Sequence, residues 1–257
     1  AMTERPTAKL AELAAALAPK EGYNQQPIKG LRLLRSESVL HNVPVLYQPG
    51  VVFVCQGIKR GILDGDVFVY DEEHYLAVAV PVPFRMESAA SPERPLLAIY
   101  LDFDMRLLAE VIGTLEQHGA QNTAMADAET LISTKIDREI QDVLRRLLTA
   151  LQSPVETAVL GDGLLRELYF RILSGPQGSN MIAALTQRGN TGRIMRSLGY
   201  LRENFTKPIS ISDLASQAGM SVPSYHAHFR RLLGSSPGQY IKSMRLHEAR
   251  LLLARQG

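Results

Sequence analysis

The fold of the C-terminal part is decided by residues 209–253, ISISDLASQAGMSVPSYHAHFRRLLGSSPGQYIKSMRLHEARLLL. Ser210 and Asp213 have the spacing of a capping box, in which the hydroxyl and the carboxylate each accept a hydrogen bond from an unpaired N–H group at a helix start. Gly219 follows, and glycine is the residue that most often ends a helix in the left-handed conformation. Ser221 is placed to cap a second helix. The stretch therefore predicts two short helices joined by a tight turn.

The second of these helices has one apolar face and one exposed face. Tyr225, Phe229 and Leu233 recur every four residues, which predicts a buried stripe. The opposite face is small and basic, and is expected to carry Pro223, Ser224, Ala227, Arg230 and Arg231, with His226 and His228 on its flanks. A short helix, a tight turn and a helix with this kind of outer face are typical of a DNA-binding helix-turn-helix.

The same stretch resembles the DNA-binding domain of AraC/XylS-type transcription regulators. The matching residues are Ala215, Gly219, Met220, Ser221, Phe229, Gly234, Ser236, Pro237, Tyr240, Arg245, Leu246, Ala249, Arg250, Leu251 and Leu252. The family domain has two helix-turn-helix motifs joined by a long helix. This sequence ends at Gly257, inside or just after that helix, so the second motif is expected to be missing from it.

The resemblance implies which residues contact DNA, because the N-terminal half of the second helix enters the major groove in this family. The residues expected at base edges are Pro223, Ser224, His226 and Ala227. Those expected at phosphates are Ser221, Arg230 and Arg231. Ala227 stands where many members carry Arg or Gln, and alanine can touch a thymine methyl group but cannot read guanine. We therefore expect His226 to be the main donor to the bases, and base specificity from this motif to be weak.

Charge is distributed unevenly along the 257 residues. Residues 186–257 contain 11 Lys and Arg but 3 Asp and Glu, a net charge of +8, whereas residues 1–185 have a net charge of −6. This asymmetry indicates a polyanionic partner for the C-terminal part alone. We expect a sensor and dimerisation domain at 1–185, a DNA-binding domain at 186–257, and a hinge at 186–191.

The cellular compartment is indicated by what the sequence lacks. Cys55 is its single cysteine, which excludes an intrachain disulfide framework and fits a reducing compartment. No apolar run reaches about 18 residues, and no signal-peptide pattern opens the sequence. We therefore expect a cytoplasmic protein without a membrane partner and, by the family resemblance, a bacterial one.

Residues 30–103 have the pattern of β-structure. Short runs rich in β-branched and aromatic residues occur at 30–34, 43–47, 51–56, 66–70, 75–82, 84–88 and 95–103. Seven or eight strands at roughly ten-residue spacing predict a small barrel or sandwich. The run 51–56, VVFVCQ, predicts a strand buried on both faces. The pair Asp64-Gly65 predicts a tight hairpin turn.

Helical periodicity precedes and follows these strands. The helices are expected at 7–17, from 104 to about 115, at 136–151, at 160–173 and at 192–203, with Asp104 as a cap. The three middle helices either cover the barrel, which we favour, or pair with a second subunit. The predicted fold class is α+β, with an N-terminal cupin-like β-barrel and appended helices, followed by an all-α helix-turn-helix domain.

The N-terminal part, over about residues 30–175, is similar to the sensor domain of one branch of AraC-type regulators. The matching residues are Tyr47, Pro49, Gln56, Gly57, Lys59, Tyr70, Tyr75, Leu76, Pro83, Ala90, Ser91, Pro92 and Pro95. The resemblance implies a cupin-like barrel that can receive a small-molecule effector. It also implies a homodimer through the helices after the barrel, and activation through RNA polymerase.

Candidate effector contacts lie on the predicted strands, because a small barrel can hold one small molecule. They are Phe53, Cys55, Tyr70, Tyr75, Arg85 and Glu87. Cys55 is either a buried small side chain or, if accessible as a thiolate, a sensor of electrophiles. Arg85 and Glu87 share one strand face and either pair with each other or meet a polar ligand.

No pattern of an enzyme stands out. The sequence lacks a Gly-rich phosphate loop, a G-x-S-x-G elbow and an H-E-x-x-H motif, so no catalytic residue or cofactor is assigned. The barrel region offers only His41 and His74 for a metal, in different contexts, so no metal site is assigned.

We therefore expect a transcription regulator that binds promoter DNA under the control of an effector. Two alternatives stay open. One is a regulator controlled by a protein partner or by dimerisation alone, and the other is a cupin-type enzyme with an accessory domain.

Overall fold

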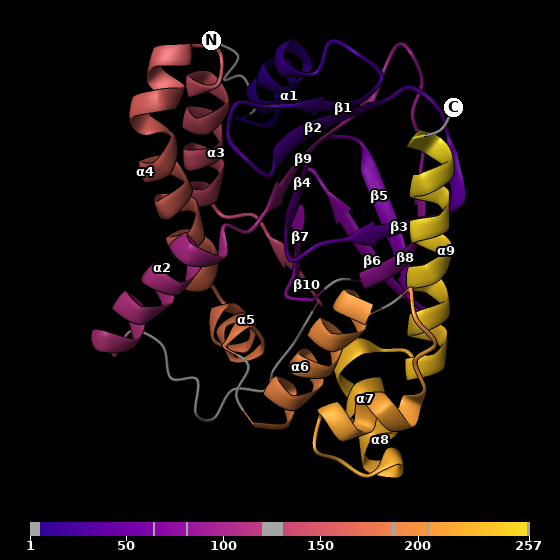
Figure 1. The fold of residues 1–257 in the computed structure, drawn as a ribbon. Coiled ribbons are helices and arrows are strands. Elements are labelled where there is room, and N and C mark those ends of the chain that lie inside the picture. The colour runs from indigo at the N-terminus through magenta and orange to yellow at the C-terminus, as the bar shows by residue number, and fades with distance from the viewer. Residues whose placement is uncertain are drawn as a thin grey trace.

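The computed structural model describes residues 6–63, 65–80, 82–119, 131–186, 189–204 and 206–255. Its N-terminal part holds two antiparallel β-sheets packed face to face, with helices outside the larger sheet (Figure 1). Its C-terminal part is helical. This arrangement confirms the α+β fold class, with strands first and the helix-turn-helix last.

The larger sheet has six strands in the order β1-β2-β9-β4-β7-β10, and the smaller sheet has four in the order β3-β8-β5-β6. The larger sheet comprises β1 (Gly22–Gln25), β2 (Leu31–Ser36), β9 (Leu96–Asp102), β4 (Gly50–Gln56), β7 (His74–Val78) and β10 (Leu131–Lys135). The smaller sheet comprises β3 (Leu40–Tyr47), β8 (Val82–Ser88), β5 (Ile58–Leu63) and β6 (Asp66–Asp71). The region of predicted strands thus contains β2 to β9, whereas β1 and β10 lie outside it and were not predicted.

Strand β4 shows why the larger sheet reads as apolar in sequence. Its residues from Gly50 to Cys55 are all buried, which confirms the predicted burial of both faces. Val51, Phe53 and Cys55 belong to a core formed with the helices, and Val52 and Val54 belong to a second core between the two sheets. The sheet is therefore the partition between two apolar cores.

The β5–β6 hairpin closes with a two-residue turn, as the sequence predicts. Leu63 pairs with Asp66, and Gly65 has φ +86°, a conformation that favours glycine. Asp64, the other turn residue, lies outside the described residues, as does Pro81 near the end of the run predicted at 75–82. That run is not one strand, because β7 ends at Val78 and β8 begins at Val82.

Helices cover the outer face of the larger sheet. They are α1 (Pro6–Leu17), α2 (Met105–Gln117), α3 (Arg138–Ala150), α4 (Pro154–Leu173) and α5 (Gly178–Leu185). Asp104 caps α2, as predicted, because its carboxylate accepts hydrogen bonds from the N–H groups of Arg106 and Leu107. The outer core joins these helices to β2, β4, β7 and β9, so the middle helices do cover the barrel.

Helix α4 begins at Pro154, six residues before the predicted start. The Ser153 hydroxyl accepts a hydrogen bond from the N–H of Glu156, and proline is favoured at the first helical position. The extra turns carry Val155 and Val159, which are exposed and so do not show the apolar periodicity of a buried face. Arg146 of α3 pairs with Glu167 of α4 at 2.7 Å and joins the two helices.

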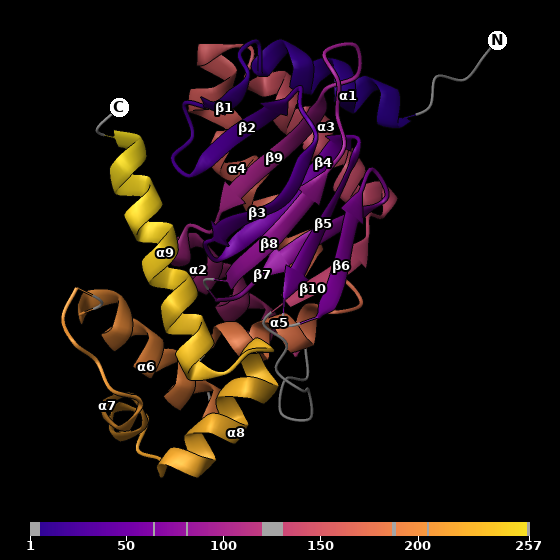
Figure 2. The same cartoon turned by 90° about the vertical axis from the view of Figure 1, so that its right-hand side faces the viewer.

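Four helices form the C-terminal part: α6 (Gly189–Asn204), α7 (Ile211–Gln217), α8 (Val222–Leu233) and α9 (Pro237–Arg255). Helix α6 begins before the predicted residue 192, within the expected hinge, of which residues 187 and 188 lie outside the described residues. Helix α9 runs along β3 and β8 of the smaller sheet (Figure 2). The buried side chains of α6–α9 continue without a break into the core between the sheets.

None of the described helices combines the length and the apolar content needed to cross a bilayer.

One charged residue lies deep between the two sheets. Lys59 of β5 has no exposed surface, and its Nζ donates a hydrogen bond to the Tyr100 hydroxyl. The hydroxyl oxygens of Tyr47 and Tyr70 are 2.5 Å apart, and those of Tyr47 and Tyr100 are 3.4 Å apart. Ser88 of β8 pairs with Lys59 across the strands and is also buried. We call Lys59, Ser88, Tyr47, Tyr70 and Tyr100 the inner polar cluster.

Burial dominates the protonation of this cluster. It lowers the pKa of Lys59 from its ordinary value of 10.5 to about 7, because the charged ammonium group loses its hydration. Burial also raises the pKa of Tyr47, Tyr70 and Tyr100 well above the ordinary value, so these hydroxyls stay protonated. The lysine is thus the member that titrates near neutral pH.

Replacing Lys59 with Met is expected to stabilise the protein more at about pH 6 than at about pH 9. Below pH 7 the lysine is charged in both the folded and the unfolded state, so folding bears the full cost of burying the charge. Between pH 7 and 10.5 the folded state releases its proton first, so this cost falls as pH rises. At about 1.4 kcal/mol per pKa unit, the total effect is several kcal/mol.

Urea unfolding followed by circular dichroism measures this difference. The exposed Lys20→Met variant is the matched control and is expected to change little at either pH. An equal gain for Lys59→Met at both pH values would contradict a buried, titrating lysine.

Candidate nucleic-acid interface

Local signals in the sequence build the helix-turn-helix as predicted. The Ser210 hydroxyl accepts a hydrogen bond from the Asp213 N–H at 3.0 Å, and the Asp213 carboxylate accepts one from the Ser210 N–H at 3.1 Å. The hydrogen bond from the Ser210 N–H lowers the pKa of the Asp213 carboxyl. Gly219 has φ +65° in the turn, and the Ser221 hydroxyl caps α8 through the Ser224 N–H. Each half of the motif therefore has a defined start.

Aromatic packing holds α8 against its neighbours. Tyr225 and Phe229 are fully buried, and the Phe229 ring meets the Tyr240 ring of α9 edge-on at 5.4 Å between centroids. The Tyr225 hydroxyl lies 2.7 Å from the Ser197 hydroxyl of α6. Burial raises the pKa of Tyr225 to about 12, so it remains a neutral core residue. The buried stripe of α8 thus fixes which face points outward.

The outward face of α8 carries the residues that the sequence predicted to contact DNA. Pro223, Ala227, Arg230 and Arg231 are exposed, Ser224 and His226 are half-buried, and Ser221 is exposed at the helix start. Ser221 is the cap of α8, and the other six residues lie along the helix outside its buried stripe. Tyr225 and Phe229 lie on the other side, so they are not stacking residues.

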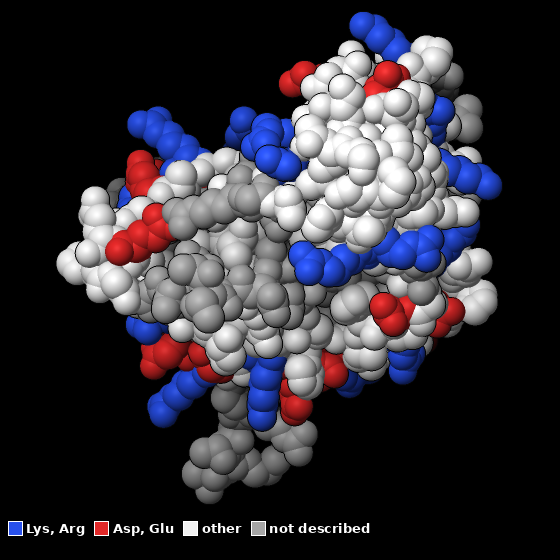
Figure 3. Space-filling view, turned by 90° about the horizontal axis from the view of Figure 1, so that it is seen from below, with Lys and Arg blue, Asp and Glu red and all other residues white. Residues whose placement is uncertain are grey.

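The electrostatics of this part of the molecule suit a polyanion. Seen from below, a band of Lys and Arg side chains crosses the half of the surface that the C-terminal helices form (Figure 3). Asp213 and Glu203 are the acidic residues of residues 189–237, and Asp213 is engaged in its capping box. A surface of this charge attracts the phosphate backbone of a nucleic acid whatever its base sequence.

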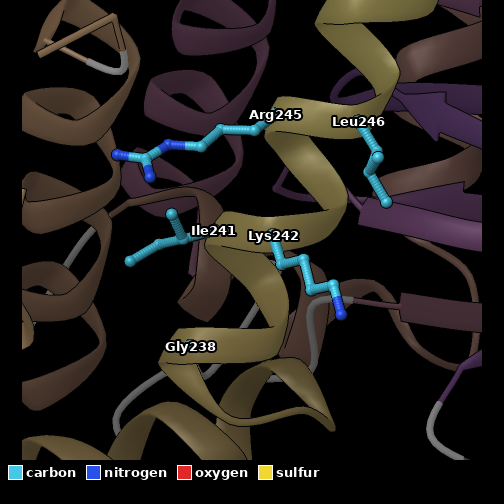
Figure 4. Close-up of a pocket in the computed structure, with 5 residues that line it drawn as sticks. All are labelled: Gly238, Ile241, Lys242, Arg245 and Leu246. Carbon is cyan, nitrogen blue, oxygen red and sulfur yellow. The ribbon is translucent and has the colours of Figure 1, made fainter. Parts of the chain in front are cut away.

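Helix α9 presents a shallow groove beside the motif. It has a volume of about 340 Å³ and is lined by Gly238, Ile241, Lys242, Arg245 and Leu246 (Figure 4). Arg245 and Lys242 point to opposite sides of the helix (Figure 4). The Arg245 guanidinium donates a hydrogen bond to the Lys207 carbonyl at 3.3 Å, which ties α9 to the segment before α7.

The six candidate effector contacts do not form one site. Phe53, Cys55 and Tyr75 belong to the outer core beneath the helices, and Tyr70 belongs to the inner core. Arg85 is exposed, and Glu87 pairs with His41 at 3.3 Å rather than with Arg85. Of this set, only Tyr70 lies in the space between the two sheets.

Cys55 does not have the properties of a reactive thiol. It is 4% exposed, and burial raises the pKa of its thiol to about 12. Since the thiolate is the nucleophile, this burial favours the reading of Cys55 as a buried small side chain over a sensor of electrophiles. His74 likewise has a local partner, because its Nδ1 lies 2.9 Å from the Asp71 carboxylate. Among the described residues, no group of three or more His, Cys, Asp or Glu is arranged to hold a metal ion.

Sequence reasoning did not select Lys59, although it was among the residues matching the sensor domain. One local signal was available, because Lys59 and Arg60 are adjacent in a strand and must point to opposite sides. One of the two cations therefore had to face the interior. Which one does so depends on the pairing of β5 with β6 and β8.

A second cavity lies where the barrel meets the DNA-binding helices. It has a volume of about 270 Å³, and its wall is mostly apolar. The barrel side and α2 contribute Gln48, Pro49, Ala79, Asp102, Phe103 and Met105, and the helices α5 and α6 contribute Leu185, Met195, Leu198 and Arg202. A ligand in this cavity would contact both parts of the molecule.

These features define a helix-turn-helix DNA-binding protein attached to a β-barrel. Comparison with protein families agrees: the N-terminus of AraC-type transcriptional regulators matches residues 27–180, and the helix-turn-helix of bacterial regulatory proteins of the AraC family matches residues 201–242. The chain therefore belongs to the AraC family of DNA-binding transcription regulators.

The solved structures that match the chain are distant from it in sequence. A structure of apo ToxT from Vibrio cholerae has 10% identity and a TM-score of 0.42, covering 85% of this chain and 99% of its own. ToxT from Vibrio cholerae bound to (E)-4-(8-methylnaphthalen-1-yl)but-3-enoic acid has 12% identity and a TM-score of 0.37, covering 84% and 99%. The AraC-like transcriptional activator CuxR has 14% identity and a TM-score of 0.27, covering 86% and 77%. None of the curated proteins compared with the chain matches it.

Replacing Ser210 with Ala is expected to destabilise the C-terminal helices by about 1 kcal/mol, because the first turn of α7 loses its cap. Ser212→Ala, on the exposed side of the same helix, is the matched control and is expected to have little effect. Thermal unfolding and amide hydrogen exchange of residues 209–220 measure the change. Equal effects of the two substitutions would argue against the capping box as a source of stability.

Proposed function

We propose that this chain is a one-component transcription regulator in which a small molecule bound by the N-terminal barrel changes the binding of promoter DNA by the C-terminal helices. Residues 1–185 are the sensing and dimerising domain in this proposal, and residues 186–257 are the DNA-binding domain. RNA polymerase is the expected partner at the promoter. The observation that carries the proposal is the exposed face of α8, whose small and basic side chains are aligned beside a buried aromatic stripe.

Control by an effector is supported by the continuity of the two cores. The side chains between the sheets and those of α6–α9 form one buried cluster, so the barrel interior is connected to the DNA-binding helices by continuous packing. An effector acts only if its affinity differs between two arrangements of these parts. The cavity shared by the barrel and α6 is a place where such a difference can arise.

A second candidate is control by a protein partner or by dimerisation, without a small molecule. One observation favours it: the inner core is nearly filled by its own side chains, and the cavity beside Tyr47 and Tyr100 has a volume of only about 10 Å³. Exposed apolar side chains on α4, namely Val155, Val159 and Leu160, offer a surface for such a contact. In this case the affinity for DNA would follow protein concentration and would not respond to metabolites.

Selection of bound fragments from a random DNA library tests the central claim. The full chain should enrich a common sequence, and labelled duplexes of that sequence then give dissociation constants with and without metabolite mixtures. Failure to enrich any sequence, together with a flat response to salt, would contradict a DNA-binding role for the α8 face.

Arg230→Ala is expected to weaken binding to all DNA sequences alike, because the proposed contact is to a phosphate. The slope of log affinity against log salt concentration should become shallower by about 1. Arg138→Ala, an exposed arginine of α3 in the N-terminal part, is the matched control and should leave both quantities unchanged. A loss confined to the selected sequence would place Arg230 at a base instead.

His226→Ala is expected to change the preference for one base pair by roughly 1–3 kcal/mol, because its ring is the proposed donor to a base edge. Binding to random DNA should fall little. Duplexes with each base pair of the selected site replaced in turn measure the effect. A uniform loss over all duplexes would contradict base recognition by His226.

A further inference from the structure

The inner polar cluster contains a cation without an anionic partner. Lys59 forms no salt bridge with any described residue, and its Nζ has a hydrogen bond to one acceptor, the Tyr100 hydroxyl. The Tyr100 ring centroid lies 4.8 Å from the same nitrogen, which adds a cation–π contact. An ammonium group has three N–H donors, so most of its donor capacity is unused within the described structure.

The other members of the cluster also offer donors. The Ser88 hydroxyl is buried and has no hydrogen-bond partner among the described residues. It lies on the strand opposite Lys59 and on the same face of the sheet. Tyr47, Tyr70 and Tyr100 contribute three hydroxyl groups that share hydrogen bonds mainly with one another. The cluster thus has unused donors on Lys59 and Ser88, and a net positive charge whenever Lys59 is protonated.

Packing alone does not account for this composition. Burying an unpaired charge or hydroxyl costs free energy, and an apolar side chain at either position would fill the space without that cost. Five polar side chains from five strands, β3, β5, β6, β8 and β9, are nevertheless buried in or beside the core between the two sheets. An acceptor-rich group brought in from outside would satisfy both Lys59 and Ser88.

We propose that the inner polar cluster is a receptor for a carboxylate, held by an ion pair with Lys59 and by hydrogen bonds from Ser88 and the tyrosine hydroxyls. A carboxylate offers about four acceptor positions and a single charge, which matches this set of donors. The surrounding wall is apolar and includes Val52, Val54, Leu76 and Phe84, so the rest of the ligand is apolar. This inference rests on the proposed control by an effector and names the effector's chemical class.

Two cavities lie near the cluster. The cavity of about 10 Å³ touches Tyr47 and Tyr100 and is also lined by Arg32, Gln48 and Asp102. Gln48 and Asp102 line the larger cavity of about 270 Å³ as well, so the two cavities adjoin at these residues, which form the wall between them in this proposal. The smaller cavity has room for about one water molecule, so a carboxylate enters only if this wall moves. Its apolar body then extends into the larger cavity.

Binding at this place acts on the DNA-binding helices. Tyr47 and Ser88 lie on β3 and β8, the two strands along which α9 runs (Figure 2). The larger cavity is closed by Met195, Leu198 and Arg202 of α6. A ligand that moves the wall between the cavities therefore shifts the supports of α6 and α9 together.

Calorimetric titration of the full chain, without DNA, tests the proposal with acetate, benzoate and octanoate as probes. Octanamide and octanol serve as neutral analogues of octanoate. At least one carboxylate is expected to bind, and its neutral analogue should bind at least about tenfold more weakly. Titration in buffers of different ionisation enthalpy near pH 8 should show proton uptake, because the ligand pairs with the charged form of Lys59.

Three variants identify the site. Lys59→Met should abolish carboxylate binding while the protein remains folded, as its unfolding curve will show. Ser88→Ala removes an unpaired hydroxyl, so it should fold normally and bind about threefold to tenfold more weakly. Lys20→Met, which changes an exposed lysine, should bind like the parent protein.

Several results would overturn the proposal. These are the absence of binding by all three carboxylates up to millimolar concentration, equal binding by Lys59→Met, and preference for the neutral analogues. Covalent trapping of octanal on Lys59 by borohydride, without octanoate binding, would show a carbonyl receptor in place of a carboxylate receptor.

If a carboxylate binds but leaves the affinity for the selected DNA unchanged, the receptor stands and control by an effector fails. If a ligand of another class changes that affinity equally in the parent and in Lys59→Met, control stands and the receptor fails.

Discussion

The structure depends on the burial of the six-stranded sheet on both of its faces. Val51 and Phe53 face the helices, and Val52 and Val54 face the smaller sheet, so β4 lies in the middle of two cores. Apolar area removed from water is the dominant favourable term in folding, and here it couples three layers of the molecule. Because the inner core also continues into α6–α9, the DNA-binding helices are packed on the same apolar structure.

This continuity gives a physical basis for regulation. The caps at Ser221 and Gly234 and the burial of Tyr225 and Phe229 fix the exposed face of α8. The position of that face relative to the rest of the molecule depends on how α6 and α9 rest on the barrel. Packed cores have discrete arrangements and do not deform continuously. A small change inside the barrel therefore tends to move the neighbouring helices as well.

Local signals explain why much of the fold was predictable from sequence. The capping box at Ser210, the glycine turn at Gly219 and the apolar stripe of α8 are each set by residues a few positions apart. Most of the strands from β2 to β9 and the cap at Asp104 were predictable for the same reason, although β5 (Ile58–Leu63) was not among the predicted runs. Strands β1 and β10 were not, because Gly22–Gln25 and Leu131–Lys135 carry little apolar pattern and become strands only by pairing with β2 and β7.

The sequence by itself determined the family, the exposed face of α8 and the uneven charge, because helix periodicity and net charge follow directly from residue order. Only the tertiary structure decided which strand residues share a space. Phe53, Cys55 and Tyr75 were candidates for the same pocket as Tyr70, but they lie on the opposite face of the larger sheet. Lys59, Ser88, Tyr47 and Tyr100 come from four strands, and only the pairing of those strands brings them together. Their convergence is a property of strand register and sheet order, which no local pattern encodes.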